Sequence, residues 1–289
     1  MNALAGLFKI KIAAMASLSA ATGWLLAGGT AGVALVLPTL ATLLLACGSA
    51  ALNELQEWRL DARMARTRER PIPAGRITPG AAAGISAALI ALGLAGLAVS
   101  AGWLAASLGA LAVVWYNGVY TPLKRRTPYA AVIGAPVGAI PPAVGWVAAG
   151  GHPGAPALHA LMLFLFLWQV PHFWLLLLAR EGEYRAAGLP SMTGVFSPPR
   201  LRRITFSWTL ALAAAASAFP LVGIARQPWA YALLLLLTAH QAVRATVLLR
   251  AGAEPAPAAM MSAFNRLNVY TLLVLALVAL DRGVGTGRF

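Results

Sequence analysis

The stretch that decides the fold runs from Asn53 to Arg76, NELQEWRLDARMARTRERPIPAGR, and it separates two long apolar runs. It holds four of the eight acidic residues and six of the 22 lysines and arginines. Asn53, Glu57 and Asp61 are spaced by four residues, so on an α-helix they lie along one face. Their oxygen atoms suit a hard cation such as Mg²⁺, and the surrounding arginines suit a diphosphate. A simpler interpretation is the solvated, charged end of a helix.

The composition is that of a membrane protein. Of the 289 residues, 60% are hydrophobic and only 10% are charged, whereas a soluble domain carries about a quarter charged residues. Apolar runs of about 20 residues predict transmembrane helices, since a transmembrane barrel shows alternating segments of about ten. We therefore predict an all-α polytopic protein that forms one domain over residues 1–289. The net charge of +14 lies in short connections between apolar runs, so no nucleic-acid partner is expected. The single cysteine excludes a disulfide within the chain.

Nine apolar segments predict nine transmembrane helices. They cover residues 10–28, 31–52, 80–100, 102–121, 129–150, 157–179, 202–224, 228–249 and 267–281.

The charges of the connections predict the orientation of the chain. With nine helices, 19 of the 22 lysines and arginines fall on one side of the membrane, and only Arg226, Arg282 and Arg288 fall on the other. Cytoplasmic connections carry the excess of positive charge, which predicts a cytoplasmic N-terminus and an external C-terminus. Seven of the eight acidic residues share the basic side, so we expect the chemistry at the cytoplasmic face.

A weak internal repeat predicts a second wall for the site. The sequence AREGEYRAAGLP, with Arg180, Glu183 and Tyr184, follows the sixth helix as Asn53–Arg76 follows the second. Two four-helix halves plus a ninth helix would bring the two segments face to face. Glu183 would then supply a further metal ligand. The alternative is an ordinary charged loop in which Tyr184 is an interfacial aromatic residue.

Three further groups are candidates for binding. Lys124 and Arg125 in YTPLKRRTP either clamp a diphosphate or only set the topology. Gln169 and His172 in FLWQVPHFW share one helix face within the membrane, where polar residues face a cavity or the bundle interior. The alternative for His172 is a hydrogen-bonded packing residue. The proline-rich helix GAPVGAIPPAVGW has a broken backbone, which membranes tolerate only where protein or a cavity covers it, so we expect a pocket wall there.

Together these motifs resemble the UbiA-type intramembrane prenyltransferases, and among them the protohaem IX farnesyltransferases. The resemblance spans nearly the whole chain: Asn53-x₃-Glu57-x₃-Asp61 with its basic tail, YTPLKRRTPYAAVIGAPVGAIPPAVGW, FLWQVPHFW, the segment around Glu183, and FNRLNVYTLLVLALVALDR. The family usually has aspartate at Glu57 and Glu183, and commonly an acidic residue at Arg59. Glutamate keeps the charge but reaches one methylene further, so the metal geometry differs.

The resemblance implies a UbiA-type bundle in a bacterial plasma membrane and Mg²⁺-dependent transfer of farnesyl from farnesyl diphosphate to a vinyl group of haem b, giving haem O. A haem-modifying or oxidase-assembly protein would act downstream. The implied metal ligands are Asn53, Glu57, Asp61 and Glu183. The implied diphosphate contacts are Arg63, Arg70, Lys124, Arg125 and Arg180, and the implied haem or pocket contacts are Gln169, His172 and Tyr184.

Two other functions remain open at this point. One is a sister transferase that prenylates a quinone precursor or another aromatic acceptor; the haem-type motifs of helices four to six argue against it. The other is a membrane transporter. Transporters place charged sites near the midplane, whereas the carboxylates here gather at one face.

Overall fold

The computed structural model describes residues 3–64, 67–186, 188–249 and 257–285, and every regular element in these ranges is helical. The all-α prediction is confirmed. In order, the elements are α1 Ala3–Leu7, α2 Ile10–Leu26, α3 Val33–Asp61, α4 Pro79–Val113, the π-helix η1 Val114–Tyr120, α5 Thr121–Leu123, α6 Ala130–Gly134, α7 Pro136–Ala148, α8 Pro156–Ala179, α9 Glu181–Ala186, the 3₁₀ turn η2 Met192–Gly194, α10 Pro198–Ser217, the 3₁₀ turn η3 Phe219–Val222, α11 Pro228–Ala245, the 3₁₀ turn η4 Thr246–Leu249 and α12 Pro257–Gly285.

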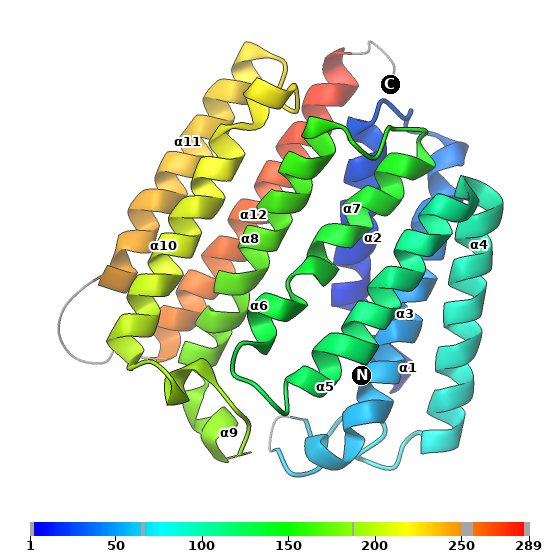
Figure 1. Cartoon of the computed structure of the whole chain (residues 1–289), viewed down its shortest axis with the longest axis vertical. Helices are drawn as coiled ribbons and strands as arrows, with labels where there is room; N and C mark the ends of the chain where they lie inside the picture. The colour runs from blue at the N-terminus through cyan, green and yellow to red at the C-terminus, as the bar shows by residue number, and fades with distance from the viewer. Residues whose placement is uncertain (1–2, 65–66, 187, 250–256, 286–289) are drawn as a thin grey trace.

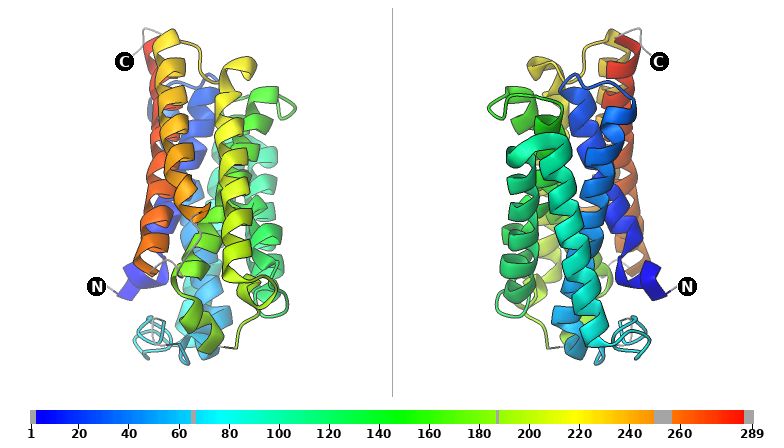
Figure 2. Two further views of the ribbon diagram at one scale, coloured as in Figure 1. Left: turned by 90° about the vertical axis from the view of Figure 1, so that its left-hand side faces the viewer. Right: turned by 90° about the vertical axis from the view of Figure 1, so that its right-hand side faces the viewer.

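The helices form an elongated bundle built for a lipid environment (Figures 1 and 2). Within the described residues, six helical stretches are long and apolar enough to cross a membrane, and α2 is a shorter apolar helix. Large apolar side chains cover the outside: Val33, Val99, Trp103 and Leu221 are 81–89% exposed. Such a surface is unfavourable in water and suits lipid. The protein is therefore an integral membrane protein. Arg66, Arg250 and Arg288, which contribute to the predicted charge asymmetry, lie outside the described residues.

One long element, α4, is bent back on itself at Gly102 (Figure 1). This residue has φ 81° and ψ 174°, a conformation that glycine reaches without steric strain. The predicted segments 80–100 and 102–121 thus become the two arms of a hairpin, and the second arm continues through η1 into α5.

Several helix ends differ from those predicted from hydropathy. The helix α3 continues nine residues past residue 52, which keeps Asn53–Asp61 helical. The helices α10 and α12 begin at Pro198 and Pro257 rather than at residues 202 and 267. Proline suits the first helical turn because no hydrogen-bonded amide is needed there. Polar first or last turns lower the hydropathy without ending the helix, which explains these differences.

The proline-rich helix α7 packs against α2 at two glycines, Gly145 of α7 and Gly23 of α2. A Cβ on Gly145 would lie 1.7 Å from the backbone oxygen of Ala20, and one on Gly23 would lie 2.0 Å from the oxygen of Pro142. Small residues at such crossings let helices in lipid approach closely. The predicted helix 129–150 is broken between α6 and α7, at Ala135. The elements α1, α5 and α9 lie at the lower end of the bundle, and α12 ends at the upper end (Figure 1).

Candidate functional site

The predicted oxygen face forms one wall of a large cavity. Asn53, Glu57 and Asp61 lie on the last turns of α3, and each is at most 5% exposed. All three line a cavity of about 760 Å³ that extends into the bundle. This burial excludes the simpler interpretation of a solvated helix end.

Each buried carboxylate is paired with a cation from another part of the chain. Lys124 Nζ lies 2.7 Å from Glu57 Oε2, and Arg70 Nη1 lies 2.7 Å from Asp61 Oδ2. All four side chains line the cavity. Burying carboxylates is unfavourable unless they are paired and hydrogen-bonded, so these contacts offset the cost of placing both of them at the cavity wall.

The amide of Asn53 is oriented by two acceptors. Its Nδ2 donates to Glu57 Oε2 and to Thr121 Oγ1, at 2.9 Å each. The opposite atom, Oδ1, accepts a hydrogen bond from Lys9 Nζ. The Asn53 amide oxygen therefore faces Lys9, and the carboxylates of Glu57 and Asp61 line the same cavity.

Lys9 is a site residue that the sequence interpretation missed, since it was taken only as a topology signal. It precedes α2 in a left-handed conformation, φ 45° and ψ 50°, which is uncommon for a residue other than glycine. Burial is the main cause that lowers the pKa of the half-buried Lys9 ammonium to about 7. The charges of Arg70 and Lys124 lower this pKa further, while those of Glu57 and Asp61 raise it. The proximity of three cations prepares this end of the cavity for an anion.

The π-helix η1 brings further polar groups to the cavity wall. Its wider turn places Asn117 against α3, where Ser49 Oγ donates to Asn117 Oδ1 and Asn117 Nδ2 donates to the Ser49 backbone oxygen at 3.0 Å. Gln56 Nε2 donates to the Asn117 backbone oxygen at 3.1 Å. Tyr116 and Tyr120 from the same element line the cavity. Short π-helical segments are frequent at functional sites, but no sequence pattern used above predicts one.

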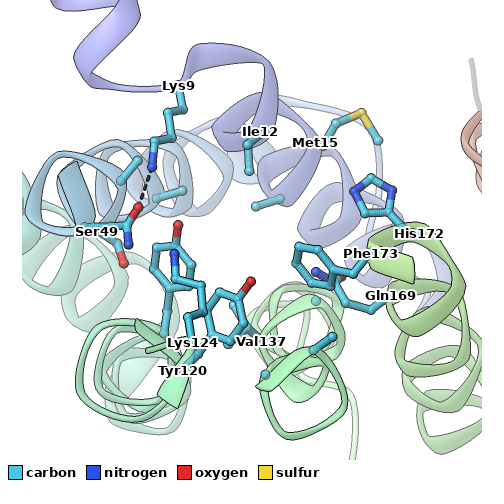
Figure 3. Close-up of a pocket in the computed structure, with 18 of the residues that line it drawn as sticks. Lys9, Ile12, Met15, Ser49, Tyr120, Lys124, Val137, Gln169, His172 and Phe173 are labelled. Atoms are coloured by element: carbon cyan, nitrogen blue, oxygen red, sulfur yellow. Dashed lines mark hydrogen bonds between the residues drawn. The ribbon is translucent and has the colours of Figure 1, made fainter. Parts of the chain in front are cut away.

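The far side of the cavity is aromatic and carries the predicted polar pair. Gln169 and His172 both line it, and Figure 3 shows them with Phe173 across from Lys9 and Lys124. The indole of Trp168 donates to Asn268 Oδ1 at 3.2 Å, and His172 Nδ1 lies 2.7 Å from the same oxygen. Because this oxygen only accepts, Nδ1 of His172 carries a hydrogen and donates it to Asn268. The residues of α6 and α7 complete the wall, which confirms the expected role of the broken helix.

The structure does not bring all predicted residues together. Tyr184 lines the main cavity, but Arg180 and Glu183 line a second, neighbouring one. Arg63 and Arg125 are exposed and do not line the main cavity; Arg125 Nη2 donates to the backbone oxygen of Gln56 at 2.6 Å. The segment after α8 therefore faces the Asn53–Asp61 wall through Tyr184 and residues 189–192, and not through Glu183.

The oxygen donors suit a hard divalent cation that is coordinated partly by the protein and partly by the phosphates of a bound substrate. Within the described ranges, no three His, Cys, Asp or Glu side chains gather as a complete protein-only metal site. Two carboxylates and one amide oxygen do gather on α3, and Mg²⁺ characteristically takes one or two carboxylates, waters and substrate phosphates. The adjacent lysines and arginine suit the phosphates. The arrangement can bind a metal-complexed diphosphate at one end and a large apolar or aromatic molecule at the other.

Curated relatives match almost the whole chain. The chain is 36% identical to a protoheme IX farnesyltransferase from Oleidesulfovibrio alaskensis, over 99% of both chains. It is 41% identical to a protoheme IX farnesyltransferase from Geobacter sulfurreducens, over 80% of this chain and 86% of the relative.

Solved structures show the same fold. A digeranylgeranylglyceryl phosphate synthase superposes with a TM-score of 0.78 at 16% identity, over 97% of both chains. A UbiA homolog from Archaeoglobus fulgidus, bound to GPP and Mg²⁺, superposes with a TM-score of 0.71 at 17% identity, over 98% of this chain and 100% of the homolog. The model of the UbiA prenyltransferase family matches residues 12–277. The chain belongs to the UbiA prenyltransferase family.

Proposed function

We propose that this protein transfers the farnesyl group of farnesyl diphosphate to a vinyl group of haem b, releasing diphosphate and giving haem O. The observation that carries the proposal is one continuous cavity with two ends of different chemistry. One end has buried oxygens and three cations, and the other has apolar and aromatic walls around His172. The choice of haem b as the acceptor rests on the relatives named protoheme IX farnesyltransferase, which are 36–41% identical to this chain.

The cationic end stabilises the leaving group. When the allylic C–O bond breaks, negative charge grows on the diphosphate, and preorganised cations at that position lower the barrier. Lys124, Arg70 and Lys9 line this end of the cavity, where Glu57 and Asp61 hold Lys124 and Arg70 in place before substrate arrives.

Mg²⁺ is proposed as the cofactor, held by Asn53, Glu57 and Asp61 together with the diphosphate. When bound it supplies positive charge to the departing diphosphate oxygens. The neighbour from Archaeoglobus fulgidus, solved with GPP and Mg²⁺, supports this chemistry for the fold. Two further assignments stay predictions, because the side chains concerned do not line the main cavity. They are Glu183 as a metal ligand and Arg63, Arg125 and Arg180 as diphosphate contacts.

The apolar end protects the reactive carbon. The farnesyl chain would lie between α2, α7 and α8, where apolar walls keep water from the allylic carbocation. The π electrons of the haem vinyl group form the new C–C bond. Water then adds to the resulting cation and loses a proton, which leaves the hydroxyl group of the product.

The aromatic end is proposed to hold the haem. His172 lies between Trp168 and Phe264, with ring centroids 4.8 and 4.6 Å away, so its ring has little freedom. Asn268 fixes its tautomer. Gln169 and Tyr184 line the same cavity and are proposed as further contacts.

The proposed setting is a bacterial plasma membrane. We propose one domain over residues 1–289 with nine transmembrane helices in two four-helix halves plus a ninth. The N-terminus is cytoplasmic, the C-terminus external, and the cationic end of the cavity cytoplasmic. A haem-modifying or oxidase-assembly protein receives the product. The two arms of α4 and the charge asymmetry of the connections support this topology.

Membranes containing the protein test the reaction. With haem b, farnesyl diphosphate and Mg²⁺, mass spectrometry should detect a farnesylated, hydrated haem, and 4-hydroxybenzoate should give no prenylated product. The Asp61→Ala variant, produced at the same level, should give no product. Absence of the haem product from folded protein would overturn the proposed acceptor, and full activity of the variant would overturn the proposed metal ligand.

A further inference from the structure

A second cavity of about 470 Å³ is lined by the C-terminal end of α8, by α9 and by the first turns of α10 and α12. None of the described residues lines both this cavity and the main one. Its apolar lining residues are Leu178, Pro198, Pro257 and Met260, and its charged lining residues are Arg180, Glu181, Glu183 and Arg202.

Two arginines and two glutamates line this second cavity, and three of these four side chains have an ion-pair partner. Glu183 Oε1 lies 3.7 Å from Arg180 Nη1, and Glu181 Oε1 lies 2.5 Å from Arg185 Nη2, so each carboxylate has a cation partner. Arg202 is only 5% exposed, and in the described part of the chain its buried Nε has no hydrogen-bond partner. Among the described residues, Arg202 is therefore the lining charge that has no ion-pair partner.

An unpaired guanidinium in a buried position is unfavourable unless an anion completes it. Its planar fork of N–H donors matches the oxygens of a phosphate group better than a lysine would. A buried arginine that lines a cavity and has no anionic partner among the described residues thus points to an anionic ligand in that cavity.

We propose that the second cavity binds the phosphate group of an anionic phospholipid. The end of α8 and the helix α9, which line the cavity, lie at the same end of the bundle as α1 and α5 (Figure 1). This end is the proposed cytoplasmic membrane surface, where basic pockets between helices bind acidic head groups. The apolar lining residues suit the glycerol and upper acyl region of a lipid. A free phosphate would leave these residues without a partner. This proposal does not depend on the proposed transferase activity, because it concerns separate lining residues.

The test uses the full chain in detergent after removal of lipid. Dioleoyl-phosphatidylglycerol, dioleoyl-phosphatidylcholine and inorganic phosphate are added separately. Native mass spectrometry measures the lipid retained, and thermal unfolding measures stability. The variant is Arg202→Gln. The control is Arg203→Gln, because Arg203 is the next residue of α10 and is exposed.

The wild type and Arg203→Gln should each retain one phosphatidylglycerol and unfold at a higher temperature with it. Arg202→Gln should retain roughly tenfold less, as expected for the loss of one charge-assisted phosphate contact. Without lipid, Arg202→Gln should unfold at no lower temperature than the wild type, because an unpaired buried charge has been removed. A purely structural arginine would instead lower the stability equally with and without lipid.

Three outcomes overturn the proposal. The first is equal retention of phosphatidylglycerol by Arg202→Gln and the wild type. The second is that phosphatidylcholine binds as well as phosphatidylglycerol, or that inorganic phosphate alone raises the unfolding temperature as much. Either result would show that the cavity does not select an anionic lipid. The third applies if Arg202→Gln does not fold. Gly182→Phe then adds a ring at the cavity lining, at a position where an added Cβ meets no neighbour, and undiminished retention would refute the site.

Discussion

Replacement of Lys124 by methionine separates the two tasks proposed for the cation-lined end of the cavity. Lys124 Nζ lies 2.7 Å from Glu57 Oε2, with the two side chains 28% and 7% exposed. Methionine keeps the length and the apolar stem of the side chain and removes only the charge. The proposal therefore predicts one effect on the rate and a separate effect on stability.

The expected loss of rate follows from the contact with the leaving group. Removing one preorganised donor from a developing negative charge lowers kcat by about 10²–10³, or about 3–4 kcal/mol. The stability loss is smaller. Breaking a fully buried ion pair costs about 3–5 kcal/mol, but Lys124 is partly exposed and Asn53 still donates to Glu57, so we expect about 1–2 kcal/mol.

A double variant distinguishes these effects. In Lys124→Met with Glu57→Gln, no unpaired carboxylate remains, so the stability should recover by about 1 kcal/mol relative to the sum of the single variants. The rate should stay low, because both the charge beside the diphosphate and one proposed metal ligand are missing. Haem O formation is followed by mass spectrometry over a range of farnesyl diphosphate concentrations, and stability by thermal unfolding.

The matched control is Arg59→Met. Arg59 is an exposed cation on the same helix as Glu57 and does not line the cavity, so its loss should leave the rate within about twofold, since distant surface charges are screened. A Lys124→Met enzyme with wild-type kcat, or a double variant that regains activity together with stability, would refute the role of Lys124 at the diphosphate.

Three further predictions concern packing, helix capping and haem. Gly145→Ala should lower the stability by about 2 kcal/mol or more in thermal unfolding, because the new Cβ would lie 1.7 Å from a backbone oxygen of α2. The control Gly84→Ala, in open space within α4, should raise the stability by about 0.5–1 kcal/mol. Equal effects of the two variants would contradict the close helix crossing. Asp281→Ala should cost about 1–2 kcal/mol, because this buried carboxylate accepts from two backbone amides just before α11, at 2.8 and 3.0 Å; an unchanged unfolding temperature would contradict this. His172→Leu should lower the haem retained on purification, read from the visible spectrum, and Asn268→Leu should lower it less; retention equal to that of the wild type would refute the haem contact.

Much of the site could be predicted from residue spacing and type. The four-residue spacing of Asn53, Glu57 and Asp61 depends only on helical geometry, so their shared face follows once the segment is helical. Hydropathy located the apolar helices, and the prolines of residues 136–142 indicated a cavity wall. The lengths of α3 and α12 were underestimated and the start of α10 was placed four residues too late, because hydropathy falls at polar first and last turns while the backbone hydrogen bonds continue.

Other parts of the site depend on residues that are far apart in the chain. The contact of Lys9 with Asn53 spans 44 positions, and that of His172 with Asn268 spans 96. No local pattern encodes such a distance. The π-helix is another example: its seven residues turn Asn117 toward α3, and neither apolar periodicity nor composition distinguishes this turn from an α-helix.

The sequence by itself determined the membrane setting, the all-helical class and the oxygen-bearing face of α3, because hydropathy and helical spacing act over a few turns of one segment. Only the tertiary structure decided which cations meet that face and that Tyr184 rather than Glu183 reaches the main cavity. It also decided that Arg202 is buried with no hydrogen-bond partner for its Nε among the described residues. These features depend on how separate helices cross and which side chains their crossing angles bring together. That geometry is set by packing across the whole bundle and is not contained in any single segment.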